Sequence, residues 1–389
     1  MKFLSQLKPN QLRNKICLLR VDLNIQNADL YGLARGFIRV PLKITAILPT
    51  IKFLTGNEAK VVILSHRGRP QKTKNLKLKT GNYSLKPFAK IFSQLLKKPV
   101  RFIDFGISQK LKSEIENSPV GSVFLLENLR FFAEEENNDK RFAEKLASLG
   151  DIYVNDAFAV SHRENASVSA ITEFLPSYVG LVLEKEVENL NSATAKFKKP
   201  LIVILGGAKV SDKVGLIDNF SKKADYFLIG GAMANTFFAS QGLPVGDSLY
   251  EKEVDLAGMA SRLGRKIVLP RDTVIYRKQI LDIGPETIKE YQKFIKNAGT
   301  IVWNGPMGLI ENERFAKGTK EIAAAILKNK NAETVIGGGE TIASLNLKAI
   351  NYKLKANVFI STGGGAMLEY LAGKKLPGLE ALNNLKINE

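Results

Sequence analysis

Four short apolar runs, each followed by two or three glycines and then by helical periodicity, constrain the fold of this chain most strongly. The clearest is LIVILGGAKVSDK, residues 201–213, and the plan recurs in DYFLIGGAM, TVIGGGET and VFISTGGGAM, which end at residues 233, 341 and 367. A short apolar run bounded by glycines is typical of a buried parallel strand, and glycine lets backbone amides approach a ligand closely. We therefore expect the four loops to line one sheet edge, where phosphate oxygens meet helix N-termini.

Two lysines follow the first glycine loop. We expect Ser211 to cap the next helix, which places Lys213 in the first turn, where the helix dipole disfavours a cation. The expected buried stripe of this helix is Val214, Ile217 and Phe220. Either lysine alone would be read as a surface residue, but Lys209 and Lys213 together directly after a strand favour an anionic ligand. Neither GxxxxGK[ST] nor GxGxxG occurs, so a nucleotide would bind by another arrangement and a dehydrogenase is disfavoured.

Length and charge bound the remaining possibilities. A chain of 389 residues favours two domains, and its apolar runs are too short to span a membrane. The N-terminus lacks the apolar core of a signal peptide, which predicts a cytoplasmic protein.

The single cysteine, Cys17, lies in an apolar run and is expected to be a buried structural thiol. A net charge of +19 favours anionic partners, but the lysines are spread along the chain, so a generally basic surface is the simpler interpretation.

Apolar runs alternate with helix-length segments throughout. The first half contains KICLLRV, KVVIL, VRFI, SVFLL and DIYV, and the second contains LIVIL, DYFLI, KIVL, TIVW, ETVI and NVFI. This alternation predicts an α/β fold whose parallel sheets carry helices on both faces. Between the two sets, residues 181–197 form one helical pattern without a strand, which is the natural connector and hinge.

Polar and cationic residues follow the strands of the first half. They are Arg20, Asp22, Asn24, His66, Arg69, Arg130, His162 and Arg163. Each alone could be a packed or solvated residue. Because ligands bind beyond the carboxyl ends of strands in open parallel sheets, their shared position predicts one crevice for a small, highly anionic molecule. Cations on one wall and phosphate-binding loops on the other suggest phosphoryl transfer across an interdomain cleft.

Ten blocks, in order, resemble the phosphoglycerate kinase family over essentially the whole chain. They are RVDLN, SHRGRP, NYSLKPFA, LLENLRF, YVNDAF, ILGGAKVSDK, IGGAMANTF, TIVWNGPMG, VIGGGET and STGGGAMLEYLAGKKLPG. The resemblance implies two Rossmann-like domains joined by a helical hinge, with a deep cleft between them. The implied divisions are a phosphoglycerate-binding domain at 1–180, the hinge at 181–200, a nucleotide-binding domain at 201–369, and a segment at 370–389 that packs back on the first domain.

The resemblance also implies a reaction and its ligands. A carboxyl-linked phosphate would pass reversibly from 1,3-bisphosphoglycerate to MgADP, giving 3-phosphoglycerate and MgATP in glycolysis or gluconeogenesis, in a monomeric, hinge-bending enzyme. The implied substrate residues are Arg20, Asp22, Leu23, Asn24, Lys43, His66, Arg69, Arg130, His162 and Arg163. The implied nucleotide residues are Ala208, Lys209, Lys213, Gly230, Gly231, Ala232, Gly284, Asn304, Leu309, Glu311, Gly338, Gly339, Glu340 and Thr341, with Glu340 holding Mg²⁺. The implied catalytic residues are Lys43, Lys209, Lys213, Gly363, Gly364 and Gly365.

The chain departs from the family pattern at several of these positions. Lys43 replaces an arginine, Asn165 replaces the second histidine of HRxH, and Glu340 replaces the aspartate of GGGDT. Ala232 and Met367 replace a glycine and a small or polar residue. The alternative hypothesis is therefore a relative of the family with reduced catalytic activity that senses nucleotides or binds polyanions. Such a protein would contact nucleic acid only through its basic surface. Negligible nucleic-acid affinity at physiological salt would contradict that alternative.

Overall fold

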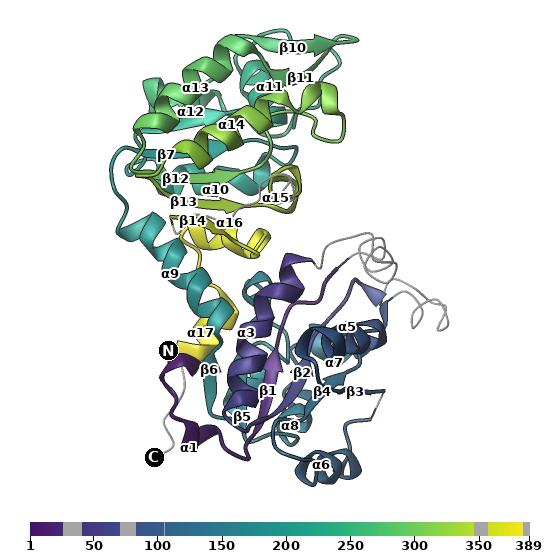
Figure 1. The fold of residues 1–389 in the computed structure, drawn as a ribbon. Coiled ribbons are helices and arrows are strands. Elements are labelled where there is room, and N and C mark those ends of the chain that lie inside the picture. Colours follow the sequence, from purple (N-terminus) through teal and green to yellow (C-terminus); the bar gives the residue numbers. More distant parts are fainter. Residues whose placement is uncertain (26–40, 71–82, 105, 346–356, 384–389) are drawn as a thin grey trace. The chain divides into compact units, whose positions relative to one another are not determined.

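The computed structural model describes residues 1–25, 41–70, 83–104, 106–345 and 357–383, which form two compact units (Figure 1). Unit 1 comprises Met1–Glu186 with Lys375–Glu389, and unit 2 comprises Val187–Lys374. Helix α9, Leu181–Ala195, contains the point at which the chain passes from one unit to the other. Its first turn is held in unit 1 by Asp156, whose Oδ1 accepts hydrogen bonds from the amides of Val182 and Leu183.

Unit 1 is built on a six-stranded parallel sheet in the order β3-β4-β2-β1-β5-β6. Its strands are β1 Ile16–Arg20, β2 Lys60–Leu64, β3 Val100–Ile103, β4 Val123–Leu126, β5 Ile152–Asn155 and β6 Ser177–Val179. Every residue of β1 and β2 is buried, as expected for strands covered on both faces. The register pairs Arg20 with both Leu64 and Asn155, so these three strand ends lie at one edge.

Helices cover both faces of this sheet. Cys17 and Leu19 face a core that includes residues of α3 and α5, whereas Ile16 and Leu18 face a core that includes residues of α6 and α8. This alternation follows from the two-residue period of a strand. The α-helices of unit 1 are α1 Pro9–Leu12, α3 Leu42–Gly56, α5 Lys86–Leu96, α6 Gln109–Glu116, α7 Ala133–Glu136, α8 Lys140–Ala147 and α17 Pro377–Asn383. Its 3₁₀ turns are η1 Leu4–Gln6, η3 Leu129–Phe131, η4 Phe158–Val160 and η5 Ala170–Glu173.

Unit 2 repeats the plan with a six-stranded parallel sheet in the order β14-β13-β12-β7-β8-β9. Its strands are β7 Leu201–Leu205, β8 Tyr226–Ile229, β9 Ile267–Val268, β12 Thr300–Asn304, β13 Glu333–Gly337 and β14 Val358–Ile360. One face packs its apolar residues against α13 and α14, and Trp303 is fully buried in that core. The α-helices are α10 Ser211–Phe220, α11 Gly231–Ser240, α12 Ala257–Leu263, α13 Pro285–Asn297, α14 Lys317–Lys328, α15 Gly339–Ser344 and α16 Gly365–Leu371. The 3₁₀ turns are η6 Gly264–Lys266 and η7 Glu313–Phe315.

The predicted α/β class with parallel sheets is confirmed, and each of the eleven apolar runs named above contains a strand. Two features are additions to the prediction. Strand β6 extends the first sheet, and an antiparallel hairpin, β10 Thr273–Tyr276 with β11 Gln279–Ile283, stands beside the second. Near the end of the chain, α17 packs on β6 and η5 of unit 1. Within the described residues, every helix is too short or too polar to cross a membrane.

Candidate functional site

The glycine loop after β7 lies against the loop after β12 in unit 2. The amide of Gly206 donates to the carbonyl of Asn304 at 3.0 Å, and that of Gly207 donates to the carbonyl of Pro306 at 2.8 Å. A Cβ added to Gly206 would lie only 2.0 Å from the Pro306 oxygen, and Gly207 has a φ of +78°. Only glycine meets both demands without strain, which explains the glycine pair in the sequence.

The two predicted lysines are linked to each other. Helix α10 starts at Ser211, so Ser211 is its first residue and not the expected cap; Val210 stands at the cap position. The carboxylate of Glu251 instead accepts hydrogen bonds from the amides of Val210 and Ser211, at 2.8 and 2.9 Å. Lys213 is buried, and its Nζ donates to the carbonyl of Lys209 at 2.8 Å. The buried stripe is also corrected, because Leu216 joins Ile217 and Phe220 while Val214 is only half-buried.

Burial lowers the pKa of Lys213. The carboxylates of Asp212, Glu340 and Glu251 act in the opposite direction and favour the charged ammonium. Glu340 therefore lies within electrostatic reach of Lys213, and its Oε2 is 3.7 Å from where a Gly207 Cβ would stand. The loops after β7 and β13 thus bring an ammonium group and a carboxylate to the same edge of the sheet.

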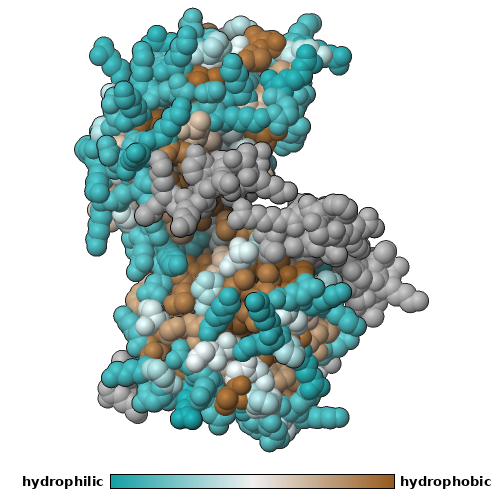
Figure 2. Space-filling model, in the orientation of Figure 1, coloured by the Kyte–Doolittle hydropathy of each residue, from teal (hydrophilic) through white to brown (hydrophobic). Residues whose placement is uncertain are grey.

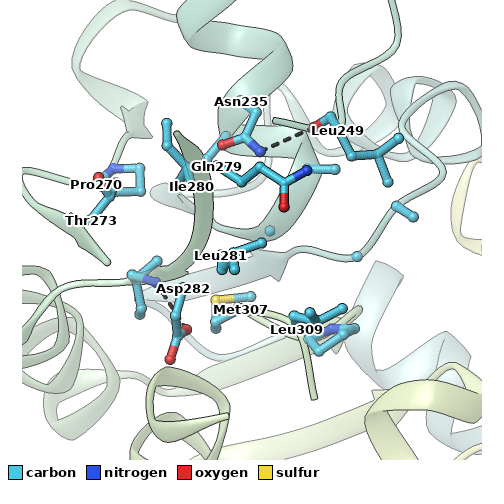
Figure 3. Close-up of a pocket in the computed structure, with 18 of the residues that line it drawn as sticks. Asn235, Leu249, Pro270, Thr273, Gln279, Ile280, Leu281, Asp282, Met307 and Leu309 are labelled. Atoms are coloured by element: carbon cyan, nitrogen blue, oxygen red, sulfur yellow. Dashed lines mark hydrogen bonds between the residues drawn. The ribbon is translucent and has the colours of Figure 1, made fainter. Parts of the chain in front are cut away.

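A cavity of about 310 Å³ opens beside these loops (Figure 3). Six residues predicted for nucleotide binding line it: Ala208, Gly231, Ala232, Leu309, Glu311 and Glu340. Residues that the sequence analysis did not select line it too: Asn235, Leu249, Thr273, Gln279, Ile280, Leu281, Asp282 and Met307. Most of the latter come from the hairpin of β10 and β11, which carried no sequence motif. The walls are mainly apolar with a few polar groups, as in small-molecule sites generally.

The other residues predicted for nucleotide binding are outside the lining of this cavity. The amide of Gly305, next to Asn304, donates to Thr341 Oγ1 at 2.8 Å and ties the loop after β12 to α15. Gly338 and Gly364 have φ of +95° and +54° directly before α15 and α16. Gly230 precedes α11, and Gly284 precedes α13, packed against Asp272. Lys209, Lys213, Gly230, Gly284, Asn304, Gly338, Gly339, Thr341, Gly363, Gly364 and Gly365 are outside the cavity lining.

Charged and amide side chains converge at the strand ends of unit 1. Lys43 Nζ on α3 lies 2.7 Å from Asp22 Oδ2 and 3.4 Å from the carbonyl of Asn24. Asn24 Oδ1 accepts from the amide of Gly68 at 2.9 Å, and the amide of Leu23 donates to Ser65 at 3.0 Å. The loop after β1 is therefore fixed to the loop after β2 and to the start of α3.

His66 is a buried, neutral imidazole in this cluster. Its Nδ1 is 3.2 Å from Arg20 Nη2, and because a guanidinium only donates, Nδ1 accepts and the ring hydrogen is on Nε2. Burial, followed by the positive charges of Arg20, Arg130, Lys43 and Arg163, holds the pKa of His66 well below its ordinary value. The ring can therefore donate one hydrogen bond to a ligand without taking a proton.

Arginines complete the cluster. Arg130 is buried, with Nη1 donating to the carbonyl of Gly68 at 2.7 Å and Nε 3.3 Å from Glu136 Oε1. Burial lowers the pKa of Arg130 to about 10, and the charge of Arg163 adds to the shift. Arg163 Nε donates to His162 Nε2 at 3.2 Å, and Arg69 is exposed. Like charges held this close favour an anionic ligand between them.

Arg20 differs from the other predicted substrate residues because it is directed into the protein. It is 1% exposed and bonds to Ser167 Oγ at 2.8 Å, to the carbonyl of Val21, and to His66. Its Nη2 lies 3.9 Å from Glu135 Oε1, which is equally buried. In this structure Arg20 supports the residues around it, a role that the sequence pattern did not distinguish from ligand contact. Asn165, a departure from the family pattern, is buried and donates to the carbonyl of Glu135 at 3.1 Å.

The buried His66 predicts a pH dependence of stability. Unfolded histidine takes a proton below its ordinary pKa of about 6.5, whereas folded His66 does not, so the free energy of unfolding should fall as pH drops from 7 to 5. The slope contributed is at most about 1.4 kcal/mol per pH unit. Urea titrations of the wild type and His66→Gln across this range measure it.

Comparing the wild type with His66→Gln controls for other groups that titrate in the same pH range. Asp156, whose pKa burial raises to about 6, contributes in the opposite direction, but it is present in both proteins. The difference between the two proteins therefore isolates the histidine. Identical pH slopes for the wild type and His66→Gln would contradict the neutral assignment.

The two units define a class: an α/β protein with a cavity beside glycine loops in one unit and a cluster of cationic side chains in the other, an arrangement suited to phosphotransferases. The family model described as phosphoglycerate kinase matches residues 7–374. A phosphoglycerate kinase of Dictyoglomus turgidum is 41% identical, covering 98% of this chain and 99% of the relative. The cytosolic phosphoglycerate kinase 3 of Arabidopsis thaliana is also 41% identical, covering 97% of each chain.

Solved structures agree with this match. The phosphoglycerate kinase of Pyrococcus horikoshii superposes with a TM-score of 0.80 at 34% identity, covering 98% of each chain. That of Coxiella burnetii gives a TM-score of 0.79 at 34% identity with the same coverage. This chain belongs to the phosphoglycerate kinase family.

Proposed function

We propose that this protein is an active phosphoglycerate kinase, which transfers a phosphoryl group reversibly from 1,3-bisphosphoglycerate to MgADP, giving 3-phosphoglycerate and MgATP. The observation that carries the proposal is the cationic cluster around His66 in unit 1. Arg130, Arg163 and Lys43 all act on that imidazole, and within the described part of the chain the carboxylates of Asp22 and Glu136 pair with Lys43 and Arg130. A small molecule with phosphate and carboxylate groups would supply the missing negative charge.

The roles of the residues follow from the chemistry of phosphoryl transfer. We assign substrate binding to Asp22, Asn24, His66, Arg69, Arg130 and Arg163, with Leu23 and His162 beside them and Arg20 supporting them. The transferring group carries spread negative charge, which Lys43, Lys209, Lys213 and the amides of residues 363–365 would stabilise. Because the attacking oxygen of ADP is already anionic, no general base is needed. The two units would act as the two domains, with the segment 181–200 as the hinge and residues 370–389 anchoring the chain end to the first.

A magnesium ion fits the second unit through Glu340. Among the described residues, no three His, Cys, Asp or Glu side chains gather into a ready-made metal cluster. Magnesium in kinases is commonly held by one or two carboxylates together with substrate phosphates, so a single glutamate beside the glycine loops is a sufficient protein ligand. The ion would neutralise charge on the nucleotide phosphates. We further propose a monomer, and a cytoplasmic location like that named for the Arabidopsis relative.

A coupled assay tests the proposed function. The purified protein is supplied with saturating 1,3-bisphosphoglycerate and MgADP, and the ATP produced is measured with a coupling enzyme. We expect turnover in the ordinary range for kinases, roughly 1–100 s⁻¹ or above. Turnover equal to that of the buffer blank would contradict the proposed activity.

The same assay tests the effect of Lys43, which occupies the place of an arginine in the family pattern. We expect Lys43→Arg to raise the turnover number about severalfold. The planar guanidinium of arginine can form two parallel hydrogen bonds to the transferring phosphoryl group, which should stabilise the transition state better than the compact ammonium of lysine. Lys43 now bonds to Asp22 and to the carbonyl of Asn24, and arginine retains both options. An unchanged or lower rate would mean that the neighbourhood has adapted to lysine. Arg39, a candidate for such adaptation, lies outside the described residues.

A further inference from the structure

Two adjoining hollows lie at the end of unit 2 where its strands begin. One, of about 570 Å³, lies between the C-terminal halves of α13 and α14, and the other, of about 400 Å³, lies beside α9 and the first residues of β12 and β13. Lys330 and Asn331 line both hollows, so we treat the two as one groove and call it the basal crevice. The cavity beside the glycine loops is lined by residues that follow β7 and β12, and therefore lies toward the opposite end of the sheet.

Four exposed lysines line the basal crevice. Lys296, Lys328 and Lys330 line the larger hollow, and Lys198 lines the smaller one. Lys198 pairs with Glu333 at 2.8 Å, whereas within the described part of the chain no carboxylate pairs with the other three lysines. Figure 2 shows hydrophilic side chains over the region of unit 2 in which Figure 1 places α13 and α14. The crevice therefore carries a local excess of positive charge.

Helix geometry explains only part of this charge. Lys296 and Lys328 stand in the last turns of α13 and α14, where a cation complements the helix dipole. Lys198 and Lys330 lie outside the helices, so the dipoles do not account for their positions. Like charges that surround one hollow favour an anionic ligand, because the ligand relieves their mutual repulsion.

The loop that carries Lys330 is held in place by Asn329, which is 8% exposed and lines the larger hollow. Its Nδ2 donates to the carbonyls of Ile295 and Ala298, at 2.7 and 3.2 Å, so it occupies carbonyl groups at the end of α13. Its Oδ1 accepts from the amides of Asn331 and Ala332, at 2.9 and 3.0 Å. The backbone on both sides of Lys330 is thus fixed before any ligand binds, which lowers the entropic cost of binding.

The other lining residues indicate which anion fits. No aromatic side chain is among the described residues that line the crevice, so it offers no surface on which nucleic-acid bases could stack. Its cations are lysines, which bind carboxylates as point charges, without the fixed fork of arginine. Ala324 and Ala325 contribute small apolar side chains, and Asn331 contributes an amide that can both donate to and accept from a peptide group. These features suit an extended chain with carboxylates and small apolar side chains.

We propose that the basal crevice binds an acidic peptide segment of a partner protein. Lys296, Lys328 and Lys330 face the carboxylates of the segment, and Ala324 and Ala325 contact its small side chains. Because three lysines of the crevice have no ion pair within the described residues, the complementary charge comes from the partner. The interaction is independent of the proposed kinase activity, since the crevice and the glycine-loop cavity lie toward opposite ends of the same sheet.

The test uses a short fluorescein-labelled peptide of alternating Glu and Ala, and a neutral peptide of alternating Gln and Ala. Each is titrated with the full-length protein, and binding is followed by fluorescence anisotropy at about 0.15 M salt, where charges beyond about 8 Å are screened. We expect the wild type to bind the Glu peptide at least about tenfold more tightly than the Gln peptide. The triple variant Lys296→Gln, Lys328→Gln, Lys330→Gln should weaken binding of the Glu peptide by about tenfold, as expected for the loss of three exposed ion pairs.

A matched control separates the crevice from the general positive charge of the protein. The triple variant Lys222→Gln, Lys289→Gln, Lys293→Gln removes three exposed lysines of unit 2 that do not line the crevice, and it has the same net charge as the first variant. It should bind the Glu peptide within about twofold of the wild type. Ala324→Gln fills part of the crevice without changing any charge, and should weaken binding severalfold.

The outcomes distinguish the acidic peptide from other anions. Equal weakening by the two triple variants would show that the peptide binds the basic surface in general, and the crevice proposal would be wrong. If tripolyphosphate binds in a way that depends on the crevice lysines while the Glu peptide does not bind, the occupant is a phosphate chain and the peptide assignment is wrong. The crevice variants should keep wild-type turnover in the coupled assay, so failure of this proposal leaves the proposed kinase activity untouched.

Discussion

Replacing Lys213 by methionine is expected to lower the turnover number by roughly a hundredfold to a thousandfold, the range found when one donor is removed from an oxyanion site. Lys213 is 5% exposed, and its ammonium is held by the carbonyl of Lys209 at 2.8 Å. An ammonium has three donors, and this bond uses one of them. The others can stabilise phosphate oxygens without the reorganisation that a mobile surface lysine would require.

Methionine keeps most of the length of lysine and removes only the charge and the donors. The coupled assay gives kcat and KM for Lys213→Met, and calorimetry gives the affinity for ADP. A larger effect on kcat than on affinity is expected if the ammonium serves the transition state more than the ground state. Lys222→Met, an exposed lysine just beyond the same helix, is the matched control and should retain wild-type turnover. A loss of less than fivefold in Lys213→Met would remove Lys213 from the catalytic residues.

The two sheets were predictable because most of their strands are buried and therefore appear as continuous apolar runs. The hairpin of β10 and β11 was not, for a local reason. Its turn consists of Arg277 and Lys278, which have φ of +47° and +61°. That conformation normally favours Asn or Gly, so the sequence carries no turn signal. Strand β6 has only three residues and no apolar run, and its pairing with β5 depends on tertiary contact.

The part of the site that was predictable is the set of residues that directly follow strand ends, because a parallel sheet brings those ends to one edge. Asp22, His66 and Arg130 follow different strands, and the sheet order brings their strand ends to one edge. The direction of each side chain could not be predicted this way. Arg20 and Lys43 look equally cationic in the sequence, yet Arg20 is buried and Lys43 is 31% exposed. Asn235 was not selected although it lies in the block IGGAMANTF, because the sequence alone does not show that its side chain reaches the carbonyl of Leu249, 14 residues further along the chain.

Replacing Arg20 by methionine is expected to lower the free energy of unfolding of unit 1 by about 3–5 kcal/mol, the usual cost of removing one partner from a buried ion pair. Glu135 would keep its bonds from Ser167 Oγ at 2.6 Å and the Ser167 amide at 2.9 Å, but its charge would lose the nearby cation. The imidazole of His66 would also lose the donor to its Nδ1. Both groups would remain buried and would be left poorly paired.

Urea unfolding can assign this loss to one unit. The only tryptophan of the chain, Trp303, is buried in unit 2, so its fluorescence follows that unit, whereas far-ultraviolet circular dichroism follows both. Arg20→Met should move the dichroism transition to lower urea and displace the fluorescence transition less. The control is Arg101→Met, which breaks the ion pair of an exposed arginine with the half-buried Glu114 and should cost less than about 1 kcal/mol.

The same variant decides between two roles for Arg20. The family resemblance places it with the substrate residues, whereas its contacts make it a support for His66 and Glu135. A direct ligand contact predicts a higher KM for 3-phosphoglycerate with little change in stability. A supporting role predicts a large fall in the free energy of unfolding and little change in KM. KM is then measured at low temperature, where nearly all of the variant is folded. If stability matches that of Arg101→Met while KM rises, the buried pair contributes little and Arg20 must reach the substrate.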